Sequence, residues 1–304
     1  VTNNSTGLEQ ANSFEPESGK IVFSPRIIDN IQEEYAPPSG EALRYSGKGF
    51  SIEQAEQLNR TNQAIIISIA FPTDKALQAN KQATRLLRSM AQDFGGFIWD
   101  EDTREVFTQD AWNEIRVKPW TGVFPKISNH ITTHAYQPND QFARAITLGM
   151  VKFGLPDIVI NEFSWSINYQ VGNFINLLGQ NLLEGGELNS KGEFIVGIDS
   201  IKNTDAKEYF SSQIFENATS EIITKVIPSS GEDGDPDNRI VEVVFDDYPG
   251  KSLQEKQERL LGSVFGWQES MSLVQHNAAI LEASNRARAK LSTLKAEFIT
   301  GLEP

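Results

Sequence analysis

Strand-like and helix-like segments follow one another along this chain without a strict alternation of strand and helix. Strand patterns fall at 64–71, 97–107 and 129–161, whereas helical spacing recurs at 166–184 and 252–265. A doubly wound parallel sheet needs regular alternation, and a mixed order is typical of sheets whose helices gather on one side. The sequence therefore predicts an α+β fold with mixed, largely antiparallel sheets and flanking helices.

The length of 304 residues indicates about two domains. Gly185-Gly186 and the polar residues that follow, up to Ser190, mark the expected boundary. We expect a disordered tail (1–18), an N-terminal α+β domain (19–187) and a C-terminal α+β domain (188–304). The polar tail is typical of a segment behind a cleaved signal or lipid anchor, although a chain start chosen for other reasons fits equally well.

Two stretches near the start of the chain have opposite character. Residues 19–50 contain the break Ala36-Pro37-Pro38-Ser39-Gly40 and are expected to be irregular. Residues 64–71 (AIIISIAF) are continuous, β-branched and uncharged, which predicts a buried strand.

The C-terminal domain is expected to end in a long amphipathic helix over 278–300. Its apolar seam recurs at steps of three and four residues, at Ile280, Ser284, Ala287, Leu291, Leu294 and Phe298. Such a seam must be covered. Its partner is either the chain's own second domain, or a downstream domain or another protein.

Charge and composition exclude several kinds of site. The 41 acidic and 27 basic residues give a net charge of -14, which disfavours binding to nucleic acid or anionic lipid. The chain has no cysteine, which excludes disulfides, thiolate nucleophiles and cysteine-based metal sites. No run of residues approaches the 18 or so apolar residues that a transmembrane helix needs.

The weak metal-site candidates are His130, His134, Asp100 and Asp102. The two histidines are expected on one strand, where a spacing of four puts them on one face but about 13 Å apart. Asp100, Glu101 and Asp102 are expected in a hairpin turn, where solvated carboxylates are the favoured interpretation over an acid–base pair. We therefore expect no bound metal and no cofactor.

Two further motifs fail at specific positions. Residues 231–238 (GEDGDPDN) are similar to a calcium loop, but Asn238 stands where glycine is needed and Val244 where a bidentate glutamate is needed. A solvated acidic loop is the favoured interpretation. Gly47-Lys48-Gly49 is similar to the start of a G-x-G-x-x-G dinucleotide-binding motif, but Ile52 stands where the third glycine is needed. The segment also precedes a strand, whereas the motif follows one.

Four blocks carry a family resemblance: GGFIWDEDTREVFT (95–108), HAYQPNDQFARAITLGMVKFGLPDIVI (134–160), DDYPGKSLQEKQERLLGSVFG (246–266) and ASNRARAKLSTLKAEFITGLEP (283–304). Together they resemble a mainly proteobacterial family of unknown function whose members carry a YegJ-like C-terminal domain. That domain would begin at about Pro304. The resemblance implies no activity and no site residue, and it implies a periplasmic or envelope-anchored protein, with the cytoplasm as the alternative.

These observations favour a non-catalytic binding or interaction module of the cell envelope over an enzyme. One alternative is a metal-assisted hydrolase that uses His130, His134 and carboxylates around Asp100. The other is a scaffold for the YegJ-like domain, with residues 278–300 as a contact for that domain or for a protein partner.

Overall fold

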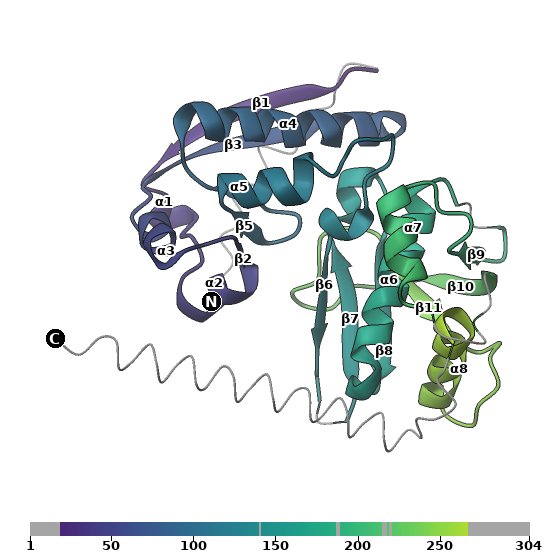
Figure 1. Cartoon of the computed structure of the whole chain (residues 1–304). Helices are drawn as coiled ribbons and strands as arrows, with labels where there is room; N and C mark the ends of the chain where they lie inside the picture. The colour runs from purple at the N-terminus through teal and green to yellow at the C-terminus, as the bar shows by residue number, and fades with distance from the viewer. Residues whose placement is uncertain (1–18, 140, 187–188, 215–217, 219–220, 267–304) are drawn as a thin grey trace.

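The computed structural model describes residues 19–139, 141–186, 189–214, 218 and 221–266 (Figure 1). The expected tail over 1–18 and the expected helix over 278–300 lie outside these residues. The described part is an α+β fold with mixed, largely antiparallel sheets, as the sequence predicts.

The larger sheet has six strands in the order β6-β7-β8-β11-β10-β9. The strands are β6 Thr132–Tyr136, β7 Ala143–Leu148, β8 Asp157–Phe163, β9 Glu193–Gly197, β10 Glu221–Ser229 and β11 Ile240–Val244. Neighbours are antiparallel except β8 and β11, which run parallel. This parallel pair joins strands from the two sides of the expected boundary at 187/188. The boundary therefore falls within one sheet, because β8 leaves an edge open to which the later strand β11 adds.

Helices cover one face of this sheet and form the main core with it (Figure 1). They are α6 Asn168–Leu183, α7 Thr204–Ser211 and α8 Leu253–Phe265. The apolar residues that recur at helical spacing over 166–184 are all buried: Ile167, which directly precedes α6, and Val171, Phe174, Ile175, Leu178 and Leu182 within it. Ser252 caps α8 by accepting a hydrogen bond from the amide of Glu255, as its capping-box sequence predicts.

A second group of elements surrounds a three-stranded sheet in the order β2-β5-β4. Its strands are β2 Gly47–Lys48, β4 Ile98–Asp100 and β5 Glu105–Phe107. The helices are α1 Ile31–Glu34, α2 Gly40–Ser46, α3 Ile52–Asn59, α4 Ala76–Phe94 and α5 Gln109–Trp112, which continues into a π-helical turn at Asn113–Val117. The hairpin expected at 97–107 is confirmed, with Trp99 opposite Val106.

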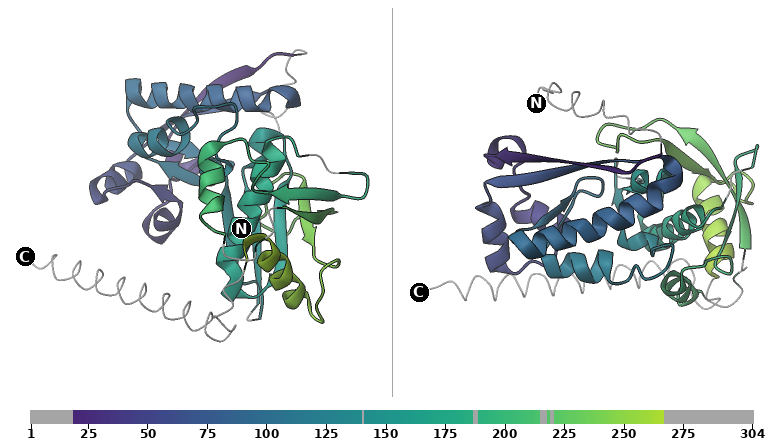
Figure 2. Two further views of the ribbon diagram at one scale, coloured as in Figure 1. Left: turned by 45° about the vertical axis from the view of Figure 1, so that its right-hand side comes forward. Right: turned by 90° about the horizontal axis from the view of Figure 1, so that it is seen from above.

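The third sheet is a two-stranded antiparallel ribbon, β1 Val22–Asp29 with β3 Gln63–Ala70. It lies beside α4 along one border of the molecule (Figure 2, right). The strand expected at 64–71 is confirmed, but its expected burial is wrong, because no residue of β3 is buried. The expectation of irregular structure over 19–50 is also wrong, since it missed β1 and two short helices.

None of the described helices is long and apolar enough to cross a membrane.

Candidate functional site

A cluster of charged side chains is buried at the β4–β5 hairpin. Nη2 of Arg116 lies 3.1 Å from Oδ2 of Asp100 and 2.8 Å from Oε2 of Glu105, and it donates to the Thr103 hydroxyl at 3.2 Å. Only 1% of the Arg116 side chain is exposed. The cation is thus withdrawn from water and paired with two carboxylates.

Two lysines complete the cluster. Nζ of Lys152 lies 2.6 Å from Oδ2 of Asp100, and Nζ of Lys48 lies 2.9 Å from Oε1 of Glu105. Burial by itself would raise the pKa of Asp100, but Lys152 and Arg116 outweigh it and hold that pKa below its ordinary value. Burial lowers the pKa of Lys152. Each carboxylate therefore has two cationic neighbours, which is how a buried negative charge is stabilised.

Aromatic rings cover the rest of the Arg116 guanidinium. Its Cζ lies 4.9 Å from the centre of the Phe107 ring and 5.8 Å from that of Trp112. Among the described residues, nothing accepts a hydrogen bond from Nε or Nη1. Cation–π contacts replace acceptors on this side. The packing favours a structural ion cluster over an open anion site.

The predicted acidic turn divides into a buried and an exposed part. Asp100 is 9% exposed and ion-paired, so its interpretation as a solvated turn residue is wrong. Asp102 is exposed, as expected of a turn residue. Although the residue is exposed as a whole, partial burial of its carboxyl group raises its pKa to about 6. Lys152 opposes this rise, and the carboxylates of Asp100 and Glu101 add to it.

The two histidine candidates do not lie on one strand. His130 follows a 3₁₀ turn and precedes β6, whereas His134 lies within β6 and is exposed. His130 is 2% exposed and packs edge-to-face against Trp120, with ring centres 4.9 Å apart. Burial, and then the nearby Arg116 and Lys152, hold its pKa well below the ordinary value, so the ring is neutral. No three His, Asp or Glu side chains of the described residues are grouped so that they could hold a metal ion.

The loop at 231–238 is tied to the six-stranded sheet. Arg144 of β7 donates two hydrogen bonds to Asp235, at 2.8 and 2.6 Å, and only 4% of the Arg144 side chain is exposed. Asn238 donates to Asp157 at 2.7 Å. Asp233 and Asp237 are exposed, as a solvated loop requires. Asp235 is not, because Arg144 occupies both of its oxygens.

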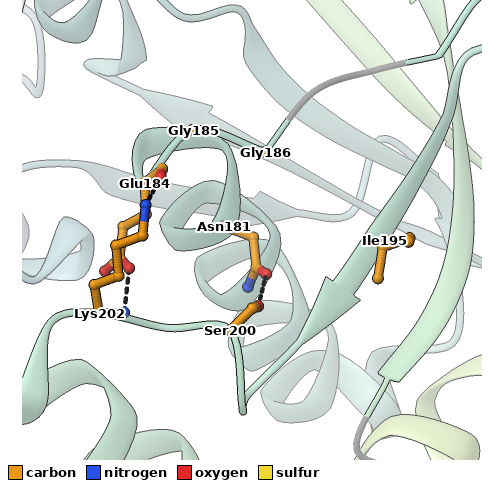
Figure 3. Close-up of a pocket in the computed structure, with 7 residues that line it drawn as sticks. All are labelled: Asn181, Glu184, Gly185, Gly186, Ile195, Ser200 and Lys202. Carbon is orange, nitrogen blue, oxygen red and sulfur yellow. Dashed lines mark hydrogen bonds between the residues drawn. The ribbon is translucent and has the colours of Figure 1, made fainter.

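A cavity of about 220 Å³ lies at the end of α6 (Figure 3). Its polar side chains are paired with their surroundings. Glu184 accepts hydrogen bonds from the backbone amides of Lys202 and Asn203, and Asn181 accepts one from the Ser200 hydroxyl at 2.9 Å. Small-molecule sites are commonly about 300–1,000 Å³ and present free polar groups. The cavity therefore reflects how the end of α6 is held to residues 198–203.

The outward face of the β1–β3 ribbon is apolar along most of its length. In the observed register Ile27 pairs with Ile65, Pro25 with Ile67 and Phe23 with Ile69, and these six residues share one face. None of the six is buried, and Ile27 and Ile65 are 70% and 44% exposed. The pair of Asp29 and Gln63 closes one end of this face, with a hydrogen bond of 2.7 Å between the two side chains. We call these six residues the ribbon face.

Sequence reasoning missed the cations that organise the buried clusters. Arg116, Arg144 and Lys152 each have an apolar residue on both sides, in EIRVK, FARAI and MVKFG. A charged residue inside an apolar stretch is a usable signal, because burying its charge requires a partner. The sequence does not show which carboxylate is that partner.

No protein-family model matches this chain, and neither the curated proteins nor the solved structures contain a match to it.

Proposed function

We propose that this chain is a non-catalytic protein-binding module whose contact surface is the ribbon face. The observation that carries the proposal is the exposure of branched apolar side chains on a sheet of only two strands. The polar clusters offer less for chemistry, because the charged groups of Asp100, Glu105 and Asp235 are each already paired.

The energetics of the ribbon favour a partner. A two-stranded ribbon is marginally stable in water unless further strands or a packed layer support it. Among the 16 residues of β1 and β3, Ile28 alone is buried. Covering an exposed isoleucine yields about 1.5–3 kcal/mol. A protein that covered Ile27 and Ile65 would therefore gain affinity and also stabilise the ribbon.

The bacterial envelope is the proposed location, and a role in holding a YegJ-like domain is the proposed alternative. Both are supported by the family resemblance alone. Cell fractionation of the native host, with a periplasmic and a cytoplasmic marker enzyme, tests the location. A signal confined to the cytoplasmic fraction would contradict it.

Photo-crosslinking in the native host tests the binding function. The full chain is given a photoreactive amino acid at Ile27 or, as a control, at the exposed Glu208 on α7. We expect discrete adducts from Ile27 and none from Glu208. A second change on the same face, Ile65→Glu, should abolish the Ile27 adducts because it places a charge in the contact. Equal labelling from both positions, or no adduct from Ile27, would overturn the proposal.

A further inference from the structure

We infer that a second copy of this chain pairs its β3 strand antiparallel with β3 across a two-fold axis. The inference goes beyond the proposed function, because pairing along the edge of β3 leaves the ribbon face free to bind another protein. It concerns the outer edge of β3, the side away from β1.

The register shows which backbone groups point to that edge. Pro25 lies opposite Ile67 and has no N–H, so these two residues cannot form the doubly hydrogen-bonded pair of an antiparallel ladder. They form the non-hydrogen-bonded kind, in which both backbones turn their N–H and C=O groups away from each other. By the alternation of the ladder, Ile65, Ile67 and Ile69 all direct these groups to the outer edge of β3. Among the described residues, β1 is the only strand that pairs with β3.

The two edges of the ribbon differ in protection. Proteins block an open strand edge with proline, charged side chains or bulges. The β1 edge has Pro25 at its middle, which removes a donor there, and Arg26 beside it. The β3 edge has no proline, no charge and no register shift over Gln63–Ala70. An unprotected edge of this length is suited to pairing with another strand.

Two-fold symmetry restricts how β3 can pair with its copy. Residues that lie opposite each other must share a face, so a residue pairs with itself at the axis. With Ile67 at the axis, Ile65 lies opposite Ile69, Ile66 opposite Ser68, and Ala64 opposite Ala70. Over the paired residues 64–70, the outward face of the joined sheet then carries only isoleucine from the two β3 strands, and Gln63, which shares this face, lies outside the pairing. With Ile66 at the axis, the polar Gln63 would instead lie opposite Ile69, so we assign Ile67 to the axis.

The absence of charge along this strand permits self-pairing. The chain carries a net charge of -14, so two copies repel each other at long range. Residues 64–71 contain no charged side chain, so no like charges meet at the axis. Added salt screens the long-range repulsion and leaves the apolar contact intact. Self-association should therefore tighten as salt is raised.

Single-cysteine variants provide a sharp test, because the chain has no cysteine of its own. In Ile67→Cys the two thiols face each other across the axis at a Cα separation of about 5.5 Å, which suits a disulfide. We expect Ile67→Cys to form a covalent dimer under mild oxidation. Ile66→Cys, Ile65→Cys and Ile69→Cys should each fail alone. An equimolar mixture of the last two should form a covalent heterodimer.

Sedimentation of the unmodified chain gives a second measurement that needs no variant. We expect a species of twice the 33.9 kDa chain mass, whose population rises with salt. Ile67→Lys should abolish it, because two lysines would meet at the axis, while the circular dichroism spectrum stays unchanged. A monomer at every concentration and salt, or equal disulfide formation by Ile66→Cys and Ile67→Cys, would overturn the inference.

The photo-crosslinking experiment separates this inference from the proposed function, because Ile27 lies on β1 and not at the β3–β3 contact. A purified dimer without adducts from Ile27 retains the second copy and overturns the binding function. Adducts that contain a different protein, with a purified chain that stays monomeric, retain the binding function and overturn the second copy as partner. A monomer without adducts overturns both.

Discussion

Nη2 of Arg116 lies 3.1 Å from Oδ2 of Asp100, and both side chains are almost wholly buried. The aspartate ends β4 and the arginine lies in the π-helical turn after α5, so the pair fastens the hairpin to that helix. Replacing a whole buried ion pair by apolar groups is often harmless, whereas removing one partner leaves an unpaired buried charge. Each charged side chain of the cluster is therefore needed as a partner for the others.

Arg116→Met should lower the free energy of unfolding by about 3–5 kcal/mol, because Asp100 and Glu105 would each lose a buried partner. Urea denaturation measures the change. The matched control is Lys118→Met, which removes an exposed pair with Glu114 and should cost less than about 1 kcal/mol. Similar small losses in both variants would show that the cluster contributes no more than a surface pair.

The pKa of Asp102 predicts a pH-dependent contribution to stability. The folded chain raises this pKa from 3.8 to about 6, so between these values the folded state binds more protons than the unfolded state. The contribution of Asp102 to the free energy of unfolding is complete below about pH 4 and is lost as the pH rises through 6. Asp100 acts in the opposite sense, since its pKa is lowered and its contribution is lost as the pH falls.

The free energy of unfolding of the natural chain should therefore fall relative to Asp102→Asn as the pH rises from 4 to 6.5. Comparing the two chains cancels the titration of other groups, such as the buried Asp157. Solvent reaches Asp102, so screening limits the size of the effect. Carbon-13 NMR titration of the carboxyl measures the pKa directly, and a midpoint near 4 would refute the prediction.

Gly172→Ala should stabilise the protein by about 0.5–1 kcal/mol, because glycine weakens a helix interior. No described atom would lie within 4 Å of a β-carbon at this position of α6. The contrasting variant is Gly192→Ala. Gly192 has a φ of +75°, and a β-carbon there would lie 2.5 Å from the Val226 carbonyl oxygen. The melting temperature should rise for Gly172→Ala and fall for Gly192→Ala. A fall for both variants would show that α6 is closely packed at Gly172.

Asp235→Asn should loosen the loop at 231–238, because it removes the charge that Arg144 binds with two hydrogen bonds. Among the described residues, Arg144 would keep only Glu232 as an anionic partner, and that side chain is 56% exposed. We expect faster hydrogen exchange in the loop and a lower melting temperature. Asp233→Asn, in the same loop but exposed, should change neither. A calcium-induced rise in melting temperature that Asp235→Asn abolishes would instead favour the calcium-loop interpretation.

The sequence by itself determined most of the local elements. The strand patterns over 129–161 form β6, β7 and β8, and the helical spacing over 166–184 and 252–265 forms α6 and α8. These signals are local, because a helix or strand repeats its apolar positions over a few residues. The strand β1 escaped the same reasoning, since Pro25 and Arg26 interrupt its apolar run in the manner of an edge strand.

Tertiary structure alone decided which elements meet. An uncharged run such as Ala64–Phe71 fits a core strand or an exposed one equally well, and the difference depends on what lies against it. The sequence likewise cannot show that β11 adds to β8, that Arg116 takes Asp100 and Glu105 as partners, or that Arg144 takes Asp235. Each of these pairings joins segments that are separate in the chain. Burial makes them necessary, because a charge or a strand edge withdrawn from water must be satisfied by whatever the fold brings next to it.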